Sequence, residues 1–351
     1  MLDNVLKVIY SNPISIILFW LLTSVGLYII TTYALTKLLI PILTRLKFGQ
    51  VVRNDGPETH LKKQGTPTMG GIVFIINFII FMIIKFITYK SNYGGDFLYR
   101  FGFIIISFGL IGLYDDLTKI LKKDSHGIKA KIKFILQILF AFIGIYLYMT
   151  YDTRFSHMFN YNYLYIPVLV FIIVGTNNAV NFTDGLDGLL TSVTIVITIF
   201  YIILSIALSA ADVMASNVVL DINCMFLGME IGFLLLNKYP AKIFMGDTGS
   251  LFFGAYVVFM AMYFHIELLL PIYGFVYFME ALSVIIQVGY FKYSHGKRIF
   301  KMAPIHHHFE KCGMSEKKVV TMFTIITIIC VIITFIILYF IIMNMQNNLY
   351  K

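Results

Sequence analysis

Long apolar runs recur along this 351-residue chain and restrict its fold more than any other feature. Residues 321–342, for example, read TMFTIITIICVIITFIILYFII. Such a run can cross a bilayer as a helix, since about 20 apolar residues suffice. Membrane-spanning strands need segments of about ten residues in which apolar and polar positions alternate, and these runs do not alternate. The chain is 59% hydrophobic and 13% charged, and it is predicted to be an all-α integral membrane protein.

Ten such runs are predicted to span the membrane, and together they form a single polytopic domain that covers residues 1–351. The predicted spans are residues 14–40, 69–89, 97–114, 132–150, 163–180, 188–209, 219–236, 249–266, 268–290 and 319–343. The first run is far longer than the apolar core of a signal peptide, and no small-residue cleavage site follows it. It is therefore also predicted to be a membrane helix.

The positive charges determine the predicted orientation of these spans. Lysine and arginine concentrate in the loops that follow the odd-numbered spans, whereas the loops on the other side hold only Lys90, Arg100 and Arg154. Because positively charged loops stay in the cytoplasm, both termini are expected on the extracytoplasmic side. This asymmetry accounts for the formal net charge of +9, which therefore indicates no nucleic-acid partner. The three cysteines lack the paired spacing of a disulfide framework or a Cys-x-x-Cys metal site.

Five polar motifs interrupt the apolar pattern, and all of them fall in predicted cytoplasmic loops or at the membrane edge of these loops. The motifs are HLKKQGTPTMGG (60–71), GLYDDLTK (112–119), NNAVNFTDGLDGLL (177–190), NKYPAKIFMGDTGS (237–250) and KMAPIHHHFE (301–310). A charge at the edge of the hydrocarbon region is costly unless it faces a polar cavity or a partner. We therefore expect an active-site cleft on the cytoplasmic face.

The residue types in these motifs favour phosphoryl transfer, which depends on positioning and charge neutralisation. Proteins hold Mg²⁺ through one or two carboxylates together with substrate phosphates. The candidate carboxylates are Asp115, Asp116, Asp184, Asp187 and Asp247. Lysines neutralise phosphates as point charges, and the candidates are Lys63, Lys119, Lys131 and Lys133. Glycines within the motifs allow the backbone to approach a ligand closely.

Each motif also has a plainer interpretation when it is taken alone. The Asp115–Asp116 pair is typical of a solvated helix end. GTPTMGG is compatible with a turn or a helix contact, because it lacks the GK[ST] of a Walker A loop. His306, His307 and His308 suggest a zinc site, but adjacent residues rarely point at one metal ion. The combination of motifs favours the phosphoryl-transfer site.

Taken in order, the motifs resemble those of the phospho-N-acetylmuramoyl-pentapeptide transferase family, part of the polyprenyl-phosphate hexosamine-1-phosphate transferase superfamily. The resemblance covers nearly the whole chain and rests on KxGTPTMGG, DDxxK, NAVNxTDGLDGL, FMGDTGS and PIHHHFE. GTPTMGG and the intact HHHFE distinguish this branch from its sister families. Phe182, where other members often carry leucine, departs from the pattern without affecting the assignment.

The resemblance implies a reaction and its participants. In a bacterial plasma membrane, phospho-N-acetylmuramoyl-pentapeptide would pass from UDP-N-acetylmuramoyl-pentapeptide to undecaprenyl phosphate. The products are lipid I, which enters peptidoglycan synthesis for cell-wall biogenesis, cell shape and cell division, and UMP. The resemblance also implies Mg²⁺ as cofactor and a homodimer.

The resemblance further assigns roles to individual residues. Asp247 is the implied magnesium ligand, and Asp115 is the implied base that removes a proton from the lipid phosphate, supported by Asp116 and Lys119. Phe244 is expected under the uracil, in a nucleotide pocket that also contains Asn178, Asn181, Asp184, Asn237 and Gln287. Residues expected near the sugar phosphate are Lys63, Thr68, His306, His307 and His308, and Lys131 is expected among the lysines at the phosphates.

Two other functions and two mechanisms remain compatible with these observations. A sister transferase would use UDP-N-acetylglucosamine with polyprenyl phosphate. A membrane transporter would need broken helices and charges near mid-membrane, where the predicted spans place only Lys85, Glu230 and Glu280. Within the favoured function, either the lipid phosphate attacks the UDP-sugar directly or Asp247 first forms a covalent phospho-enzyme. The stem-peptide variant and the role of each histidine stay open.

Overall fold

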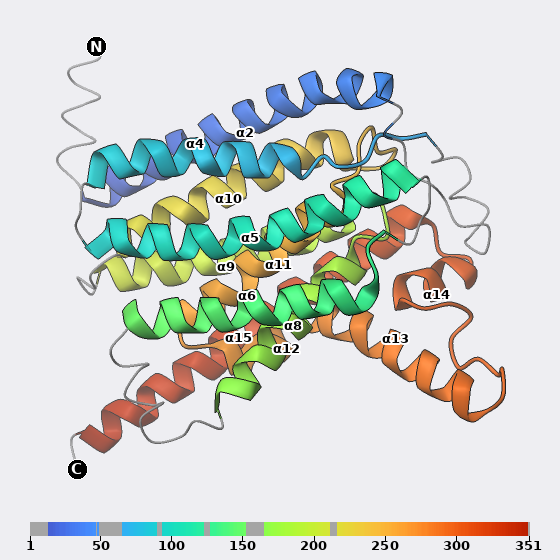
Figure 1. The fold of residues 1–351 in the computed structure, drawn as a ribbon. Helices are drawn as coiled ribbons and strands as arrows, with labels where there is room; N and C mark the ends of the chain where they lie inside the picture. Colours follow the sequence, from blue (N-terminus) through green and yellow to red (C-terminus); the bar gives the residue numbers. More distant parts are fainter. Residues whose placement is uncertain are drawn as a thin grey trace.

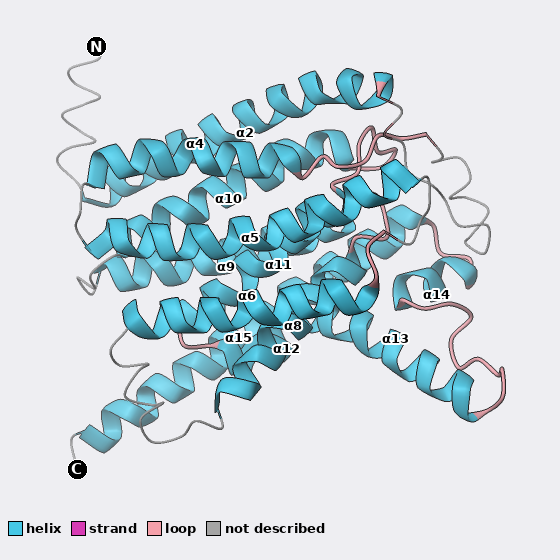
Figure 2. Cartoon of the chain, in the orientation of Figure 1, coloured by secondary structure: helices cyan, strands magenta, loops and turns pink. Residues whose placement is uncertain are grey.

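The computed structural model describes residues 13–46, 48, 65–89, 93–122, 127–151, 165–210 and 216–349. Within these ranges every regular element is a helix (Figure 2). The all-α prediction is therefore confirmed for the described part of the chain.

The described helices run in chain order as follows: α2 (Pro13–Arg45), α4 (Ile72–Tyr89), α5 (Tyr93–Lys122), α6 (Ala130–Tyr151), α8 (Tyr165–Thr183), α9 (Leu189–Ala210), α10 (Ser216–Asn237), α11 (Gly246–Tyr263), the 3-10 turn η1 (Glu267–Leu269), α12 (Leu270–Tyr273), α13 (Phe275–Tyr293), α14 (Ile305–Lys311) and α15 (Glu316–Leu349). Most of them lie roughly along one direction in a bundle, while α13 leaves the bundle at an angle (Figure 1).

Each predicted span corresponds to a helical segment, but ten membrane crossings are not confirmed. Among the described residues, eight helices hold a stretch long and apolar enough to cross a membrane: Leu21–Arg45, Gly95–Lys122, Ala130–Tyr151, Tyr165–Thr183, Leu189–Leu208, Asn217–Asn237, Phe275–Tyr293 and Glu316–Asn344. The predicted span 69–89 corresponds to the shorter apolar helix α4. The predicted span 249–266 corresponds to α11, whose first turn, GDTGS, lowers the hydropathy of an otherwise apolar helix.

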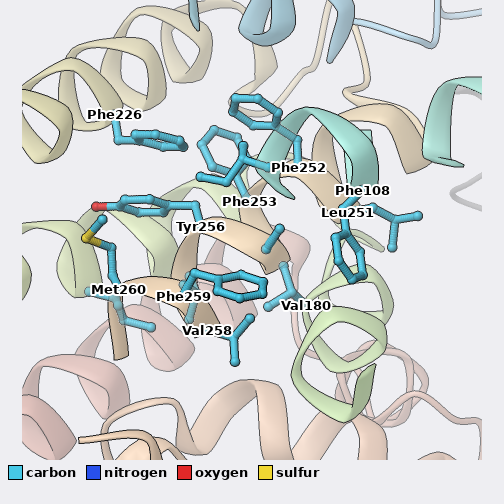
Figure 3. Close-up of a cluster of buried hydrophobic side chains, with 14 of the residues drawn as sticks. Phe108, Val180, Phe226, Leu251, Phe252, Phe253, Tyr256, Val258, Phe259 and Met260 are labelled. Carbon is cyan, nitrogen blue, oxygen red and sulfur yellow. The ribbon is translucent and has the colours of Figure 1, made fainter. Parts of the chain in front are cut away.

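Helix α11 forms the centre of the bundle. Every residue from Thr248 to Met262 is buried, as expected for a helix that is apolar on all sides. It packs against α5, α8, α9 and α4. The rings of Phe226 and Tyr256 stack on its α10 side with centroids 3.7 Å apart (Figure 3). This all-round packing holds the first turn of α11, and with it Asp247, in a defined place.

The described segments that carry the polar motifs lie at one end of the bundle, away from the start of α2 and the end of α15 (Figure 1). Residues 67–71 pair with residues 244–245. Phe244 N donates to Pro67 O at 2.8 Å, and Gly70 N and Gly71 N donate to Phe244 O and Met245 O at 2.9 Å. These hydrogen bonds join the GTPTMGG motif to the start of the GDTGS motif at this end of the bundle.

Candidate active site

Three carboxylates from two helices meet at this end of the bundle. Asp115 and Asp116 lie near the end of α5, and Asp247 lies in the first turn of α11. One oxygen atom from each lies within 4.8 Å of the others. Asp115 and Asp116 are 2% and 3% exposed, so the plainer interpretation of a solvated helix end does not apply to them. Buried charges require partners, and these are close by.

Two lysines compensate this charge. Lys119 Nζ lies 2.8 Å from Asp115 Oδ2 and 3.0 Å from Asp247 Oδ2. Lys133 Nζ, from α6, lies 2.5 Å from Asp247 Oδ2 and 3.6 Å from Asp115 Oδ2. We call Asp115, Asp247, Lys119 and Lys133 the carboxylate–lysine cluster. The four-residue spacing of Asp115 and Lys119 does place both side chains on one helix face.

Further hydrogen bonds orient the two carboxylates of the cluster. Asn181, from α8, donates through Nδ2 to Asp247 Oδ1 at 3.0 Å and to Ser250 Oγ at 2.7 Å. The backbone N–H of Ile128 donates to Asp115 Oδ1 at 2.9 Å. Each carboxylate thus has one oxygen fixed by a neutral donor, while its second oxygen faces the lysines.

These donors fit a divalent cation. The Asp115 and Asp247 oxygens that face Lys119 already share one cationic group at 2.8 and 3.0 Å, so they are close enough to share a single positive ion. Carboxylate oxygens are the ligands that Mg²⁺ prefers in proteins. The cluster therefore offers an acidic metal site beside two cations that can meet phosphate groups.

Asp116 is bound differently from its neighbour Asp115. Its Oδ1 accepts from the backbone N–H of Asp247 at 3.1 Å. Its Oδ2 accepts from the backbone N–H and the hydroxyl of Thr248 at 2.9 and 2.7 Å. Lys119 Nζ is 3.8 Å from Asp116, farther than from either carboxylate of the cluster. Asp116 is therefore engaged mainly with the start of α11.

The two aspartates of the turn after α8 have separate roles in the structure. Asp184 is half-buried, and burial followed by the negative charges of Asp247 and Asp116 raises the pKa of its carboxyl well above the ordinary value. Asp187 instead joins three segments. Its Oδ2 accepts from Ala241 N at 2.9 Å, and its own N–H donates to Glu316 Oε1 at 2.6 Å. Asp184 is thus the aspartate that is electrostatically linked to the cluster.

The three consecutive histidines have three separate partners. His306 Nδ1 lies 2.9 Å from Glu280 Oε2, and His307 Nδ1 lies 2.9 Å from Glu310 Oε2. His308 Nδ1 accepts from Lys301 N at 3.1 Å. The three Nδ1 atoms are therefore held by three different groups.

His306 also packs tightly against the turn that carries Asp184. A Cβ atom added to Gly185 would lie 2.1 Å from His306 Nε2, so only glycine fits this place without a shift. His306 is fully buried, and its partner Glu280 belongs to α13. We call turn 184–188 together with α14 the rim of the site. The rim is joined to α13 through this histidine.

Several other predicted residues hold neighbouring segments in place. Asn178 Nδ2 donates at 2.8 Å to Gln137 Oε1 of α6. Asn237 Nδ2 donates to Ile243 O at 2.9 Å, and Gln287 Oε1 accepts from Phe300 N at 2.9 Å. These contacts fix the loop before α11 and the loop before α14, both of which border the site.

The remaining predicted residues differ in their placement. Phe244 and Thr68 are half-buried in the paired segments 67–71 and 244–245. Lys131 is exposed on α6, whereas Lys133 on the same helix reaches the cluster. Lys63 lies outside the described residues.

Glu280 was considered from the sequence only as a charge within a predicted span, and Thr248 and Ser250 were not singled out. Helical spacing could have favoured Lys133 over Lys131. Lys133 lies four residues before Gln137, which begins the buried face of α6.

Comparison with known proteins gives consistent results over most of the chain. Residues 98–265 match Glycosyl transferase family 4, and residues 63–75 match signature 1 of phospho-N-acetylmuramoyl-pentapeptide-transferase. The phospho-N-acetylmuramoyl-pentapeptide-transferase of Clostridium acetobutylicum is 46% identical over 306 residues, which cover 85% of this chain and 92% of the relative. The protein of the same name from Clostridioides difficile is 45% identical over 299 residues, which cover 83% and 89%.

Proposed function

This chain belongs to the phospho-N-acetylmuramoyl-pentapeptide-transferase family, and from this premise we propose how its carboxylate–lysine cluster carries out the family reaction. The protein is a bacterial plasma-membrane transferase that makes lipid I for peptidoglycan synthesis. The proposed mechanism rests on one observation, the meeting of carboxylates and lysines from separate helices. Carboxylates from α5 and α11 meet lysines from α5 and α6 at one end of the bundle. Positioning and charge neutralisation of this kind are what phosphoryl transfer requires.

Asp247 is the residue that would hold Mg²⁺, and the neighbouring Asp115 is reserved for proton transfer. When bound, the ion supplies neutralisation of the charge that develops on the diphosphate of the donor. Asn181 keeps the Asp247 carboxylate oriented through its hydrogen bond to Oδ1, which leaves Oδ2 directed at the cationic side of the cluster. The magnesium dependence expected from the sequence can thus be tested by substitution of Asp247.

Asp115 acts as the base toward the lipid phosphate. Its Oδ1 is fixed by Ile128 N, while Oδ2 faces the lysines, where a phosphate would enter. The second proton of a phosphate monoester has a pKa of about 6 and an ordinary aspartate carboxyl group has one of about 4, so the proton transfer is uphill by only about two pKa units. The deprotonated oxygen then bonds to the sugar-linked phosphorus of the donor, and the bond from that phosphorus to the UMP oxygen breaks.

Lys119 and Lys133 neutralise the phosphates during this exchange. Their ammonium groups lie within 3.0 Å of Asp247 Oδ2, so a small rotation brings either group to a phosphate bound beside the carboxylates. A lysine is suited to this role because it carries a compact charge on a flexible stem. Lys131 and Lys63 are the further lysines expected at the phosphates.

The remaining contacts follow from the placement of the loops. Phe244 is proposed to stack under the uracil, with Asp184 and Asn181 nearby in the nucleotide pocket. Asn178, Asn237 and Gln287 maintain this pocket through the segments that they hold. Thr68, His306, His307 and His308 border the sugar phosphate. The cluster opens to the cytoplasm, both termini lie outside, and undecaprenyl phosphate enters from the bilayer.

A UMP-release assay with the protein in nanodiscs tests this proposal. UMP should appear only when UDP-N-acetylmuramoyl-pentapeptide, undecaprenyl phosphate and Mg²⁺ are all present. Replacing the donor by UDP-N-acetylglucosamine provides the control for the sister transferases. Release from that donor at an equal rate, or release without Mg²⁺, would contradict the substrate or the cofactor respectively.

A further inference from the structure

Helix α11 begins without a cap of its own. Its N-cap residue is Met245, which makes no side-chain hydrogen bond to the first turn. The first backbone N–H groups of a helix have no partner within the helix, and a polar N-cap side chain normally accepts from the second or third of them. Methionine cannot do this, and Met245 and Thr248 at the start of α11 are fully buried. Another group must accept these hydrogens.

Asp116 supplies the missing acceptor from a different helix. With Met245 as N-cap, the second and third residues of α11 are Asp247 and Thr248. Their backbone N–H groups donate to Asp116 at 3.1 and 2.9 Å, which is the pattern of an N-cap side chain. The hydroxyl of Thr248 adds a third donor at 2.7 Å. A carboxylate here also interacts favourably with the positive end of the helix dipole.

A close contact brings α5 directly against the start of α11. Gly112 lies one turn before Asp116 on α5, and a Cβ atom added to it would lie 2.1 Å from Asp247 O and 2.6 Å from Thr248 N. Only glycine therefore lets the first turn of α11 rest directly on α5 at this point. The same helix face then presents the Asp116 carboxylate to the N–H groups of that turn.

We propose that Asp116 is a positioning residue, which caps α11 from α5 and so holds Asp247 in place, and that it is neither a metal ligand nor a base. Both Asp116 oxygens are used by α11 donors, whereas Asp115 and Asp247 each keep an oxygen directed at the lysines. The effect of this cap on the transfer reaction rests on the proposed function, whereas the cap itself rests only on the hydrogen bonds given above.

The test measures thermal unfolding of the full-length protein in detergent, with and without Mg²⁺, together with kcat. Asp116→Asn removes the charge and part of the accepting capacity. The melting temperature without metal should fall by about 2–4 °C, because the amide NH2 group that replaces one carboxylate oxygen cannot accept, which leaves a buried donor of α11 without a partner. The Mg²⁺ concentration for half-maximal thermal stabilisation should change by less than about threefold, while kcat falls about 10- to 100-fold through misplacement of Asp247. The shape of the pH–rate profile should not change.

Thr248→Val provides a second, milder variant that removes only the hydroxyl donor, and Thr248→Ser is its matched control because it keeps that hydroxyl. We expect Thr248→Val to lower the melting temperature and Thr248→Ser to restore most of the difference. In a double-mutant cycle, the effect of Thr248→Val should shrink in the Asp116→Asn background, because the two side chains share one interaction.

The proposal is overturned if Asp116→Asn leaves the metal-free melting temperature unchanged and abolishes stabilisation by Mg²⁺, because Asp116 would then be a ligand. Additive effects in the cycle also contradict it. Failure of the proposed function would look different: the wild-type protein would release no UMP from the two substrates, while the loss of thermal stability in Asp116→Asn would persist.

Discussion

The carboxylate–lysine cluster is carried by long helices of the bundle, whereas the rim consists of a turn and the seven-residue helix α14. In the cluster, charges face opposite charges at 2.5 to 3.6 Å. In the rim, isolated hydrogen bonds, such as those of His306 with Glu280 and of Asp187 with Ala241, and the close contact of Gly185 with His306 hold the parts in place. Substitutions in the cluster should therefore mainly change the chemical step, whereas substitutions in the rim should mainly change binding and stability.

The largest effect is expected for Asp247→Ala. The variant removes the proposed magnesium ligand from a site with few carboxylates, so UMP release should be abolished at any Mg²⁺ concentration. Stabilisation of the protein by Mg²⁺ in thermal unfolding should disappear as well, which gives a readout that does not depend on catalysis. Wild-type activity at saturating Mg²⁺ would exclude Asp247 as the ligand.

Asp115→Asn should have the next largest effect. The side chain keeps its shape and loses its basicity, and a positioned general base contributes about 100- to 10,000-fold. We expect kcat to fall by about that range near neutral pH. The loss should shrink above about pH 6–7, where the phosphate loses its second proton unaided.

The matched control for this variant is Asp96→Asn on the same helix. Asp96 is exposed and pairs with Arg100, far from the cluster in sequence, so kcat should be unchanged. A large loss in Asp115→Asn that does not vary with pH would contradict the role of base. It would indicate instead that Asp115 is a metal ligand or a structural anchor.

A smaller effect, on binding and stability, is expected for Gly185→Ala in the rim. The added methyl group would lie 2.1 Å from His306 Nε2, and that ring is buried and held by Glu280. Overpacking of this kind costs about 1–3 kcal/mol, so the melting temperature should fall and KM for the UDP-sugar should rise. Gly175→Ala is the matched control, because nothing lies within 4 Å of its added Cβ. Equal behaviour of the two variants would disprove the coupling between His306 and the turn.

The comparison of these two regions also shows what the sequence could predict. The apolar runs predict the helices well, because burial in lipid or in the bundle depends on composition and length alone. Ten crossings are not confirmed, because α4 is a shorter apolar helix and the polar first turn of α11 lowers the hydropathy of that helix. The DDxxK and GDTGS motifs predict the cluster because helical spacing and residue type are enough to bring Asp115 and Lys119 to one face.

Contacts between elements were harder to predict from the sequence. Whether Lys131 or Lys133 faces the cluster depends on the rotation of α6, which is set by Gln137 and the small residues that follow it. The pairing of His306 with Glu280 depends on the angle at which α13 leaves the bundle. The different environments of Asp115 and Asp116 depend on where α11 begins, which no local pattern on α5 reveals.

The smallest expected effect concerns Asp184. This residue lies in the rim, and the negative charge of Asp247 in the cluster contributes to its raised pKa. Burial and the nearby carboxylates raise its pKa in the folded protein, so the unfolded chain ionises first as the pH rises. Folding stability linked to this group is therefore present below the ordinary carboxyl pKa of about 4 and is lost as the pH rises through the higher folded-state pKa.

Asp184→Asn removes this loss, because the amide stays neutral at every pH. The variant should melt at a higher temperature than the wild type at pH 7–8, and the difference should vanish near pH 4. Its kcat/KM should nevertheless fall, since the carboxylate is proposed to contact the nucleotide. Phe182→Leu, an uncharged exposed substitution on the preceding helix, is the control and should shift the melting temperature equally at both pH values. A stability gain that is absent at pH 8, or equal at pH 4 and pH 8, would show that the pKa of Asp184 is not raised in the folded protein.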